Sequence, residues 1–353
     1  MKKKTNVKEI GGDYSLSDIP LLLGAGDSKG GLFASGSILL DSGRSAFRYL
    51  LGALKYDQVI LLPAYLCESV LAPLGDYGVK FDFYRINADL SIDMNDLKSK
   101  ISKKTKMIYI IKYFGFDFNR EEREFMRNTA CKILLDVSHS LTAGDDRYDY
   151  LIGSLRKILP VPDGGILFSK RPIAGSNIER SQPSSYLNVR LAAMLLKSWS
   201  LGRNIGEKQN YLDIFARSEA LLDRQKSVYS ISSVSEEAIR LLSLENMIKR
   251  RKANFEYLKE KLGLKGISKQ IAANSPIYKF PLLVAAGKRN KLLRLLIKND
   301  IYASRHWPCL VGLNKDLYKG AASLAAKMLA IPIDQRYGRP EMERIVSLLE
   351  QYV

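Results

Sequence analysis

Short, nearly continuous apolar runs alternate with amphipathic stretches through the first half of this 353-residue chain, and this alternation constrains the fold most strongly. Runs such as 107–111 (MIYII) and 132–135 (KILL) have the length of strands, whereas 44–54 and 120–128 have the apolar spacing of helices. Strands that are apolar at almost every position are typical of a parallel sheet covered on both faces. The pattern therefore predicts an α/β fold with a mostly parallel central sheet.

The second half of the chain indicates a smaller unit after the sheet. Mostly helical sequence extends to about residue 262 and includes one long amphipathic stretch over 235–262 that predicts a single helix. Shorter strand-like and helical stretches then alternate to the end of the chain, which is typical of an α+β unit. We predict an N-terminal arm over 1–30, a large domain over 31–240 and a small C-terminal domain over 241–353.

The composition excludes several classes of protein. With 55 Lys and Arg against 37 Asp and Glu, the net charge is +18, but the basic residues are mostly spread singly and no nucleic-acid-binding motif accompanies them. Three scattered cysteines and two distant histidines, His139 and His306, do not form a disulfide framework or a metal centre. No apolar run reaches the roughly 18 to 20 residues of a membrane span, and the basic N-terminus lacks the apolar core of a signal peptide. We expect a cytoplasmic protein with no nucleic-acid partner, membrane span or bound metal.

Residues that directly follow the predicted strands are the candidates for binding, because ligands of open parallel sheets lie at the carboxyl ends of the strands. Ser42, Gly43, Arg44 and Ser45 join the first strand to its helix, where backbone N–H groups can hold a phosphate. An ordinary capped helix with a turn glycine explains the same four residues equally well.

Two further strand ends carry ionisable residues. Asp136 closes the run 132–135, with His139 three residues later, and a helix cap is the competing interpretation. Lys157 follows the predicted strand that ends at Ser154 and precedes a glycine turn, although a single lysine is more often a solvated surface charge. A phosphate cradle, a strand-end carboxylate and a strand-end lysine together suit pyridoxal 5′-phosphate (PLP).

At these residues the chain resembles the DegT/StrS-like family of fold-type-I, PLP-dependent enzymes, best known as nucleotide-sugar aminotransferases. The family's S-G-T-S-A segment resembles 42–46 (SGRSA), its E-D-A-A-[HQ] motif resembles 135–139 (LDVSH), and its lysine and glycine turn resembles 157–165. The segments 305–308 (RHWP) and 329–333 (LAIPI) are similar to its small domain.

The resemblance implies a role for each residue. Gly43, Arg44 and Ser45 would hold the phosphate, and Asp136 would pair with the pyridine nitrogen. His139 would contact or orient the ring, and Lys157 would form the Schiff base with the cofactor.

Three positions depart from the family pattern. Cys67 occupies the place of the aromatic residue that stacks on the ring, so Tyr65 is the alternative stacking residue. Ile152 replaces a phosphate-binding serine, a role that Ser154 would then take. The substrate-loop motif N-Y-R-M is absent, and the corresponding region is 229–233 (YSISS).

The leading expectation is a homodimeric PLP aminotransferase that moves an amino group from an amino acid such as glutamate to a nucleotide-linked keto sugar, in polysaccharide or glycan synthesis. Another PLP-dependent reaction, or a non-catalytic protein that kept the fold, is the alternative. A histidine in place of the lysine marks the family's dehydratase branch, so Lys157 argues against that branch. His306 and Trp307 either line the substrate entrance or pack in the small domain.

Overall fold

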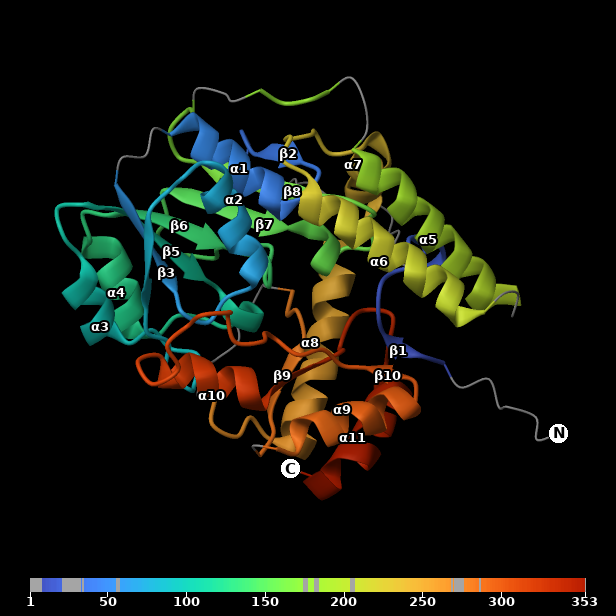
Figure 1. Ribbon diagram of the computed structural model, residues 1–353. Coiled ribbons are helices and arrows are strands. Elements are labelled where there is room, and N and C mark those ends of the chain that lie inside the picture. Colours follow the sequence, from blue (N-terminus) through green and yellow to red (C-terminus); the bar gives the residue numbers. More distant parts are fainter. Residues whose placement is uncertain are drawn as a thin grey trace.

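A seven-stranded sheet forms the centre of the computed structural model (Figure 1), which describes residues 8–20, 33, 35–54, 58–173, 177–180, 184–203, 207–267, 269, 276–285 and 287–352. The strand order is β2-β8-β7-β6-β5-β3-β4, and all neighbours from β7 to β4 are parallel. Only β8 runs antiparallel to both of its neighbours. The strands are β2 (Ile38–Leu40), β3 (Val59–Pro63), β4 (Phe81–Tyr84), β5 (Thr105–Ile111), β6 (Lys132–Asp136), β7 (Tyr150–Ser154) and β8 (Gly165–Ser169).

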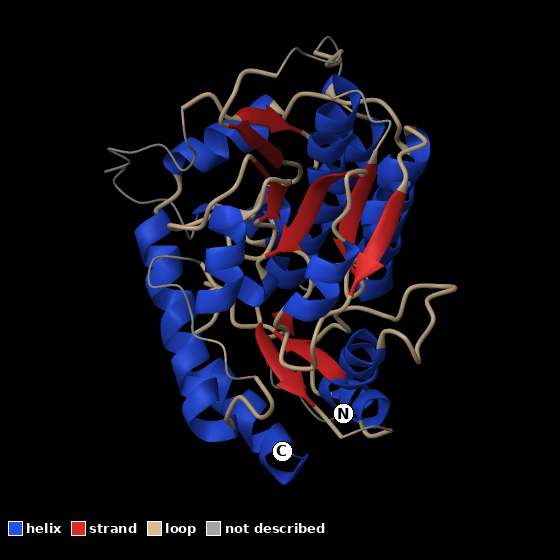
Figure 2. Cartoon of the chain, turned by 90° about the vertical axis from the view of Figure 1, so that its left-hand side faces the viewer, coloured by secondary structure: helices blue, strands red, loops and turns tan. Residues whose placement is uncertain are grey.

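Helices lie on both sides of these strands (Figure 2), as the nearly continuous apolar sequence of β5 and β6 requires. The mostly parallel α/β fold predicted from the sequence is confirmed. The helices between the strands are α1 (Gly43–Ala53), α2 (Leu71–Asp76), α3 (Met94–Lys100) and α4 (Arg120–Asn128). Two longer helices, α5 (Ser185–Arg203) and α6 (Lys208–Arg224), pack against each other after β8.

The single long helix predicted over 235–262 is wrong, because the structure has two helices there. Helix α7 (Ser233–Leu241) ends before Leu242, and helix α8 (Leu244–Leu262) begins after Ser243. The backbone of both Leu242 and Ser243 is extended. Leu242 is buried at this break. Since the apolar spacing continues across both helices, the sequence pattern alone does not reveal where the chain turns.

The C-terminal part of the chain lies below the main sheet in Figure 1. In it β9 (Phe280–Leu283) pairs antiparallel with β11 (Met328–Ile331), flanked by α9 (Arg289–Lys298), α10 (Lys319–Lys327) and α11 (Arg339–Leu349). Strand β1 (Ile10–Gly11), from the expected N-terminal arm, pairs with β10 (Ile301–Tyr302) of the same chain. Most of the arm, residues 1–7 and 21–30, lies outside the described residues.

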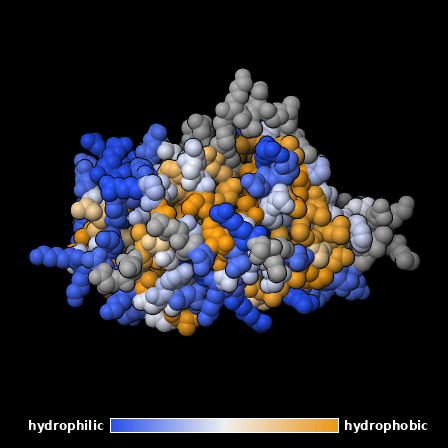
Figure 3. Space-filling model, turned by 90° about the horizontal axis from the view of Figure 1, so that it is seen from above, coloured by the Kyte–Doolittle hydropathy of each residue, from blue (hydrophilic) through white to orange (hydrophobic). Residues whose placement is uncertain are grey.

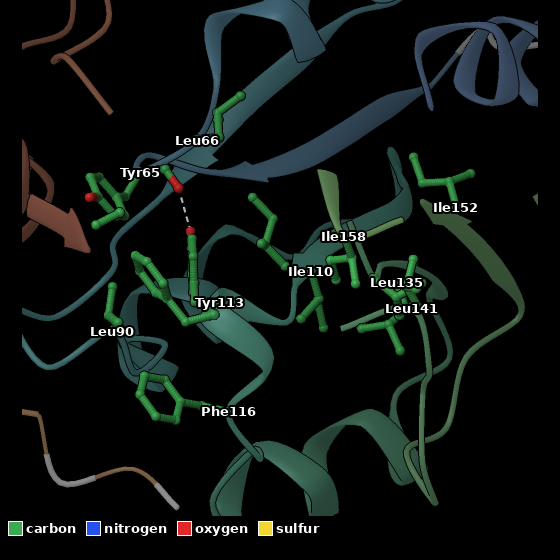
Figure 4. Close-up of a cluster of buried hydrophobic side chains, with 14 of the residues drawn as sticks. Tyr65, Leu66, Leu90, Ile110, Tyr113, Phe116, Leu135, Leu141, Ile152 and Ile158 are labelled. Carbon is green, nitrogen blue, oxygen red and sulfur yellow. Dashed lines mark hydrogen bonds between the residues drawn. The ribbon is translucent and has the colours of Figure 1, made fainter. Parts of the chain in front are cut away.

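One large cluster of buried apolar residues extends from the main sheet into the C-terminal part. Figure 4 shows a portion of it, in which Ile110, Leu135 and Ile158 are at most 1% exposed and Tyr113 donates a hydrogen bond to the carbonyl of Tyr65. This packing fixes the carboxyl ends of β5 and β6 and the turn after β7. No helix in the described ranges is long and apolar enough to cross a membrane.

Candidate functional site

A cleft lies at the carboxyl ends of the parallel strands, where ligand sites of such sheets are found. The strand-end residues Asp136, Ser154 and Lys157 all line it. The predicted residues that line the cleft are Gly43, Arg44, Cys67, Asp136, His139, Ser154, Lys157 and Trp307. The fold therefore brings together most of the residues that the sequence analysis selected from distant parts of the chain.

The beginning of α1 forms one end of this cleft. The Oγ of Ser42 accepts a hydrogen bond from the N–H of Ser45 over 3.1 Å, so Ser42 caps the helix. Helix geometry leaves the N–H groups of Gly43 and Arg44 without intrahelical acceptors, and these two residues line the cleft. Ser45 is fully buried and does not line it. The capped-helix interpretation is correct, and it is compatible with anion binding at the same turn.

Two glycines bring this turn close to the strands beneath it. A Cβ atom on Gly165 of β8 would lie 2.1 Å from the carbonyl oxygen of Ser42, so only glycine fits there. A Cβ on Gly43 would lie 3.3 Å from the carbonyl oxygen of Gly153 in β7. The glycine turn that the sequence analysis compared with the family motif therefore gives the helix its close approach to the sheet.

Asp136, at the end of β6, is held at both carboxylate oxygens. Oδ2 accepts a hydrogen bond from the Tyr109 hydroxyl over 2.7 Å, and Oδ1 accepts one from the N–H of Ser138 over 2.8 Å. Burial raises the pKa of Tyr109 well above its usual value, and the Asp136 charge raises it further, so the phenol remains a donor. Within the described ranges no helix begins at Asp136 and no ion pair involves it, so the cap interpretation does not apply.

Lys157 ends the short 3₁₀ turn that follows β7, and it is partly buried. Its amine makes no ion pair or hydrogen bond with any residue that the structure describes. The next residue is held firmly, since the carbonyl of Ile158 accepts hydrogen bonds from Tyr14, Arg251 and Gln335 over 2.9, 3.0 and 3.2 Å. A lysine held between two cavities in this way is not an ordinary solvated surface charge.

His139 stacks between two aromatic rings at the edge of the cleft. Its ring centroid is 4.5 Å from Tyr278 and 5.3 Å from Trp307, with nearly parallel planes. Burial lowers the pKa of His139 well below its usual value, as does the nearby Lys157, so the imidazole is neutral. Nδ1 accepts a hydrogen bond from the N–H of Phe114 over 3.3 Å, which places the proton on Nε2. Nε2 is a buried donor without a described acceptor.

Two other predicted residues lie away from the cleft. Tyr65 is 2% exposed, and its ring packs against Tyr113 and Trp307 with centroids 5.7 and 5.4 Å away. The prediction that Tyr65 stacks on a cofactor finds no support in this placement, whereas Cys67 does line the cleft. His306 lies behind the cleft, where its Nδ1 is 3.1 Å from the Oγ of Ser304 and its ring is near His139.

Two residues that support Asp136, Tyr109 and Ser138, were not predicted from the sequence. Tyr109 is one position in a uniformly apolar strand, so its pattern gives no sign of a polar role. Ser138 was visible, because a serine two residues after an aspartate commonly closes a turn through its N–H. Its Oγ also accepts the N–H of Ser154 over 3.1 Å and so connects the ends of β6 and β7.

Comparison with known proteins identifies the architecture. No protein-family model matches the sequence, and no curated protein matches it. Among solved structures, the aminotransferase TlmJ from Streptoalloteichus hindustanus has a TM-score of 0.63 at 17% identity, over 95% of this chain and 88% of its own. The sugar aminotransferase CalS13 from Micromonospora echinospora has a TM-score of 0.58 at 15% identity, over 89% and 87%.

This protein has the fold of the sugar aminotransferases. A dehydratase of E. coli, the GDP-4-keto-6-deoxy-D-mannose-3-dehydratase solved with bound hydrated PLP, shares it as well, with a TM-score of 0.61 at 18% identity over 89% of this chain and 87% of its own. The sugar-aminotransferase fold therefore supports more than one reaction, and the side chains in the cleft must distinguish them.

Proposed function

We propose that this protein is a PLP-dependent aminotransferase that transfers an amino group from an amino acid, glutamate, to a nucleotide-linked keto sugar. The observation that carries the proposal is the convergence of Asp136, Lys157 and the first turn of α1 on one cleft. These residues come from three different strand ends, and together they supply the groups that PLP needs.

The side chains in the cleft fit PLP on three counts. The first N–H groups of α1 and the neighbouring Arg44 suit a phosphate group. Asp136 has its carboxylate oriented by Tyr109 and Ser138, which suits a protonated ring nitrogen. The buried Nε2–H of His139 has no acceptor in the part of the chain that the structure describes, and an oxygen on the cofactor ring would supply one.

Each of these residues then has a defined task. When bound, PLP supplies an electron sink that stabilises the negative charge left on an amino-acid carbon after loss of its proton. Asp136 would hold a proton on the ring nitrogen through its carboxylate, which Tyr109 and Ser138 orient. The amine of Lys157, which has no competing partner among the described residues, would hold the cofactor covalently. It would be released when the amine of the amino-acid donor takes its place, and the free amine would then remove and return the substrate proton. Trp307 and His139 exclude water from this side of the cleft.

The sugar acceptor is supported by the solved structures of similar fold. CalS13 is a sugar aminotransferase, and the E. coli dehydratase acts on a GDP-linked keto sugar. Lys157 favours amination over dehydration, because a histidine marks the dehydratase branch of the family that this sequence resembles. We place the product in polysaccharide or glycan synthesis in the cytoplasm, and the working form as a homodimer.

The reaction is tested by incubating the PLP-loaded protein with L-glutamate and a panel of nucleotide-linked 3-keto and 4-keto sugars. We expect 2-oxoglutarate and an amino sugar to form in equal amounts, and only when a keto sugar is present. Formation of a deoxy sugar without 2-oxoglutarate would assign the protein to dehydration instead. A PLP-loaded protein that converts neither the sugars nor simple keto acids would contradict the enzymatic proposal.

A further inference from the structure

A second cavity opens on the other side of Lys157, away from α1. Its walls come from the N-terminal segment at Gly11–Tyr14, from the 3₁₀ turn with Lys157, from α5 and α8, and from the C-terminal part of the chain. Among the described residues six basic and two acidic side chains line it. An excess of positive charge beside the candidate catalytic lysine suggests an anionic ligand, but only if some of that charge is free.

Most of the basic side chains in this cavity already have partners, and Arg251 is fully engaged. Arg251 donates all five of its N–H groups, to Gln335 and to oxygens of Ile277, Tyr278, Tyr14 and Ile158. A guanidinium with no N–H left over cannot bind a ligand.

The other three arginines are paired with carboxylates. Arg336 is bound to both oxygens of Asp334, while Arg156 and Arg190 both bind Glu219. Arg190 also binds Asp13 over 2.6 Å. The arginines therefore hold the walls of the cavity together, and carboxylates or carbonyls already compensate their charge. The buried Nε–H of Arg190 is left without an acceptor among the described residues, but its guanidinium is already paired with Asp13 and Glu219.

Lys279 is different from these arginines. Its Nζ donates to the Oγ of Ser304 over 2.7 Å and lies 5.1 Å from the ring centroid of Tyr278, and no described carboxylate lies within ion-pair distance. Ser304 in turn contacts His306, whose pKa is lowered well below its usual value, first by burial and then by Lys279. Apart from Lys157, Lys279 is the cavity cation in the described part of the chain that lacks both a counter-ion and a full set of hydrogen bonds.

The surroundings of Lys279 disfavour an uncompensated charge. Burial lowers the pKa of its amine to about 8, and Arg336 and Lys157 lower it as well, while Asp334 and Asp13 partly oppose this. At neutral pH most of the amines still carry the proton. An anion beside Lys279 would offset the unfavourable free energy of burying its positive charge. It would also raise the pKa of the amine.

We propose that Lys279, together with the Ser304 hydroxyl, binds a carboxylate group of the amino-acid substrate; this rests on the function proposed above. One ammonium beside one hydroxyl suits a singly charged carboxylate. A sugar-linked diphosphate carries more charge and would need the arginines that are already paired. The cavity also places such a carboxylate next to Lys157, which must reach the proton on the adjoining carbon.

The test uses glutarate, a dicarboxylate with no amine to transfer, and measures its binding by calorimetry. The protein is loaded with PLP and reduced with borohydride, so that Lys157 is blocked and no turnover occurs. We expect Lys279→Met to raise the Kd for glutarate at least tenfold, Lys279→Arg to restore most of the affinity, and Lys291→Met, an exposed lysine on α9, to leave it unchanged. Glutarate binding to the wild type should weaken as the pH rises through about 8, and this pH dependence should be absent in Lys279→Met.

A parallel titration with UDP distinguishes the source of the anion. If Lys279→Met weakens UDP and leaves glutarate unchanged, the residue serves the nucleotide and the proposal is overturned. Equal glutarate affinity in Lys279→Met and wild type also overturns it. Should Lys279→Met not fold, Lys279→Gln replaces it with the same expected outcome. Failure of PLP to attach to Lys157 would contradict the proposed function instead, and the same titrations on the unloaded protein would still decide the role of Lys279.

Discussion

Asp136, at the end of β6, is the carboxylate that the proposed cofactor chemistry depends on. Its position after four apolar residues marks the carboxyl end of a strand, and the same reasoning located Lys157 and His139. Their actual partners come from elsewhere: Tyr109 from the neighbouring strand and Trp307 from the C-terminal part. Such partners depend on strand order and register, which a local pattern does not contain.

Replacing Asp136 by Asn should remove the negative charge while keeping the shape of the side chain. We expect the rate of the half-reaction with glutamate to fall about a hundredfold, the size of effect seen when one preorganised electrostatic group is removed from an active site. Stopped-flow absorbance of the PLP-loaded variant measures this rate. Asp316→Asn, on an exposed loop, should react like the wild type. An undiminished rate in Asp136→Asn would show that this carboxylate does not serve the cofactor ring.

The buried carboxyl group of Asp41 should make the stability of the protein depend on pH. It is 1% exposed, only one of its oxygens has a described partner, and burial raises its pKa to about 6, with a further contribution from Asp163. Because the folded protein holds this proton more tightly than the unfolded chain, the contribution to stability is complete below about pH 4. It is lost as the pH rises through 6.

The variant Asp41→Asn has no carboxyl group to ionise at this position, so it does not lose stability in this way as the pH rises. Relative to the wild type, its free energy of unfolding should therefore increase by about 2 kcal/mol between pH 4 and pH 7. Urea unfolding at the two pH values measures the difference. A constant difference between the two proteins across this range would mean that Asp41 does not titrate as described.

At the scale of elements, the turn that carries Lys157 depends on three segments distant in sequence. Tyr14, Arg251 and Gln335 all donate to the carbonyl of Ile158, and they come from the N-terminal segment, α8 and the loop after β11. The sequence predicted the strand before this turn and the helix that became α8. It did not predict their meeting, since the three donors are polar residues in segments with no shared motif.

Arg251→Met should therefore destabilise the protein strongly. The guanidinium is 1% exposed, and its loss leaves several buried carbonyls, including those of Ile277 and Tyr278, short of a donor. At about 1–3 kcal/mol for a buried group left unsatisfied, we expect a loss of about 3 kcal/mol or more. Urea unfolding measures it, with Arg250→Met, the exposed neighbour, as the matched control. Equal unfolding midpoints for the two variants would contradict the account of this network.

The break between α7 and α8 shows that apolar spacing alone does not reveal where one helix ends and the next begins. Both helices continue one apolar pattern, and only the extended backbone at Leu242 and Ser243 separates them. The predicted boundary of the large domain falls close to this break, and that boundary stays a prediction.

At the scale of the whole molecule, the net charge of +18 does not all lie on the surface as free charge. In Figure 3, hydrophilic residues gather at the left and along the lower edge of one face, and hydrophilic and hydrophobic residues are interspersed over the rest of its described surface. Inside the molecule, several basic side chains are fixed in buried ion pairs or hydrogen-bond networks, as Lys112 is with Asp146 and Arg251 is with backbone carbonyls. Part of the positive charge therefore supports the structure. Among the described basic residues that line the two cavities, Lys157 and Lys279 have no carboxylate partner, and Arg251 is bound to carbonyls instead.

The overall architecture was predictable because β5 and β6 are apolar throughout and their helices are amphipathic, so only a covered parallel sheet can bury them. The pairing of β1 with β10 was not, because each strand has only two residues and the two lie far apart in the sequence, so no local pattern indicates the partner. The environment of Lys279 was not predictable either, because the fold alone determines which carboxylates lie near its amine.

The attachment of PLP to Lys157 tests the central claim most directly. The purified protein is incubated with PLP, reduced with borohydride and digested, and the peptide that carries the pyridoxyl group is identified by mass spectrometry. We expect stoichiometric labelling of Lys157 in the wild type and its loss in Lys157→Ala. Label on another lysine, such as Lys279, or no label in the wild type, would contradict the proposed function.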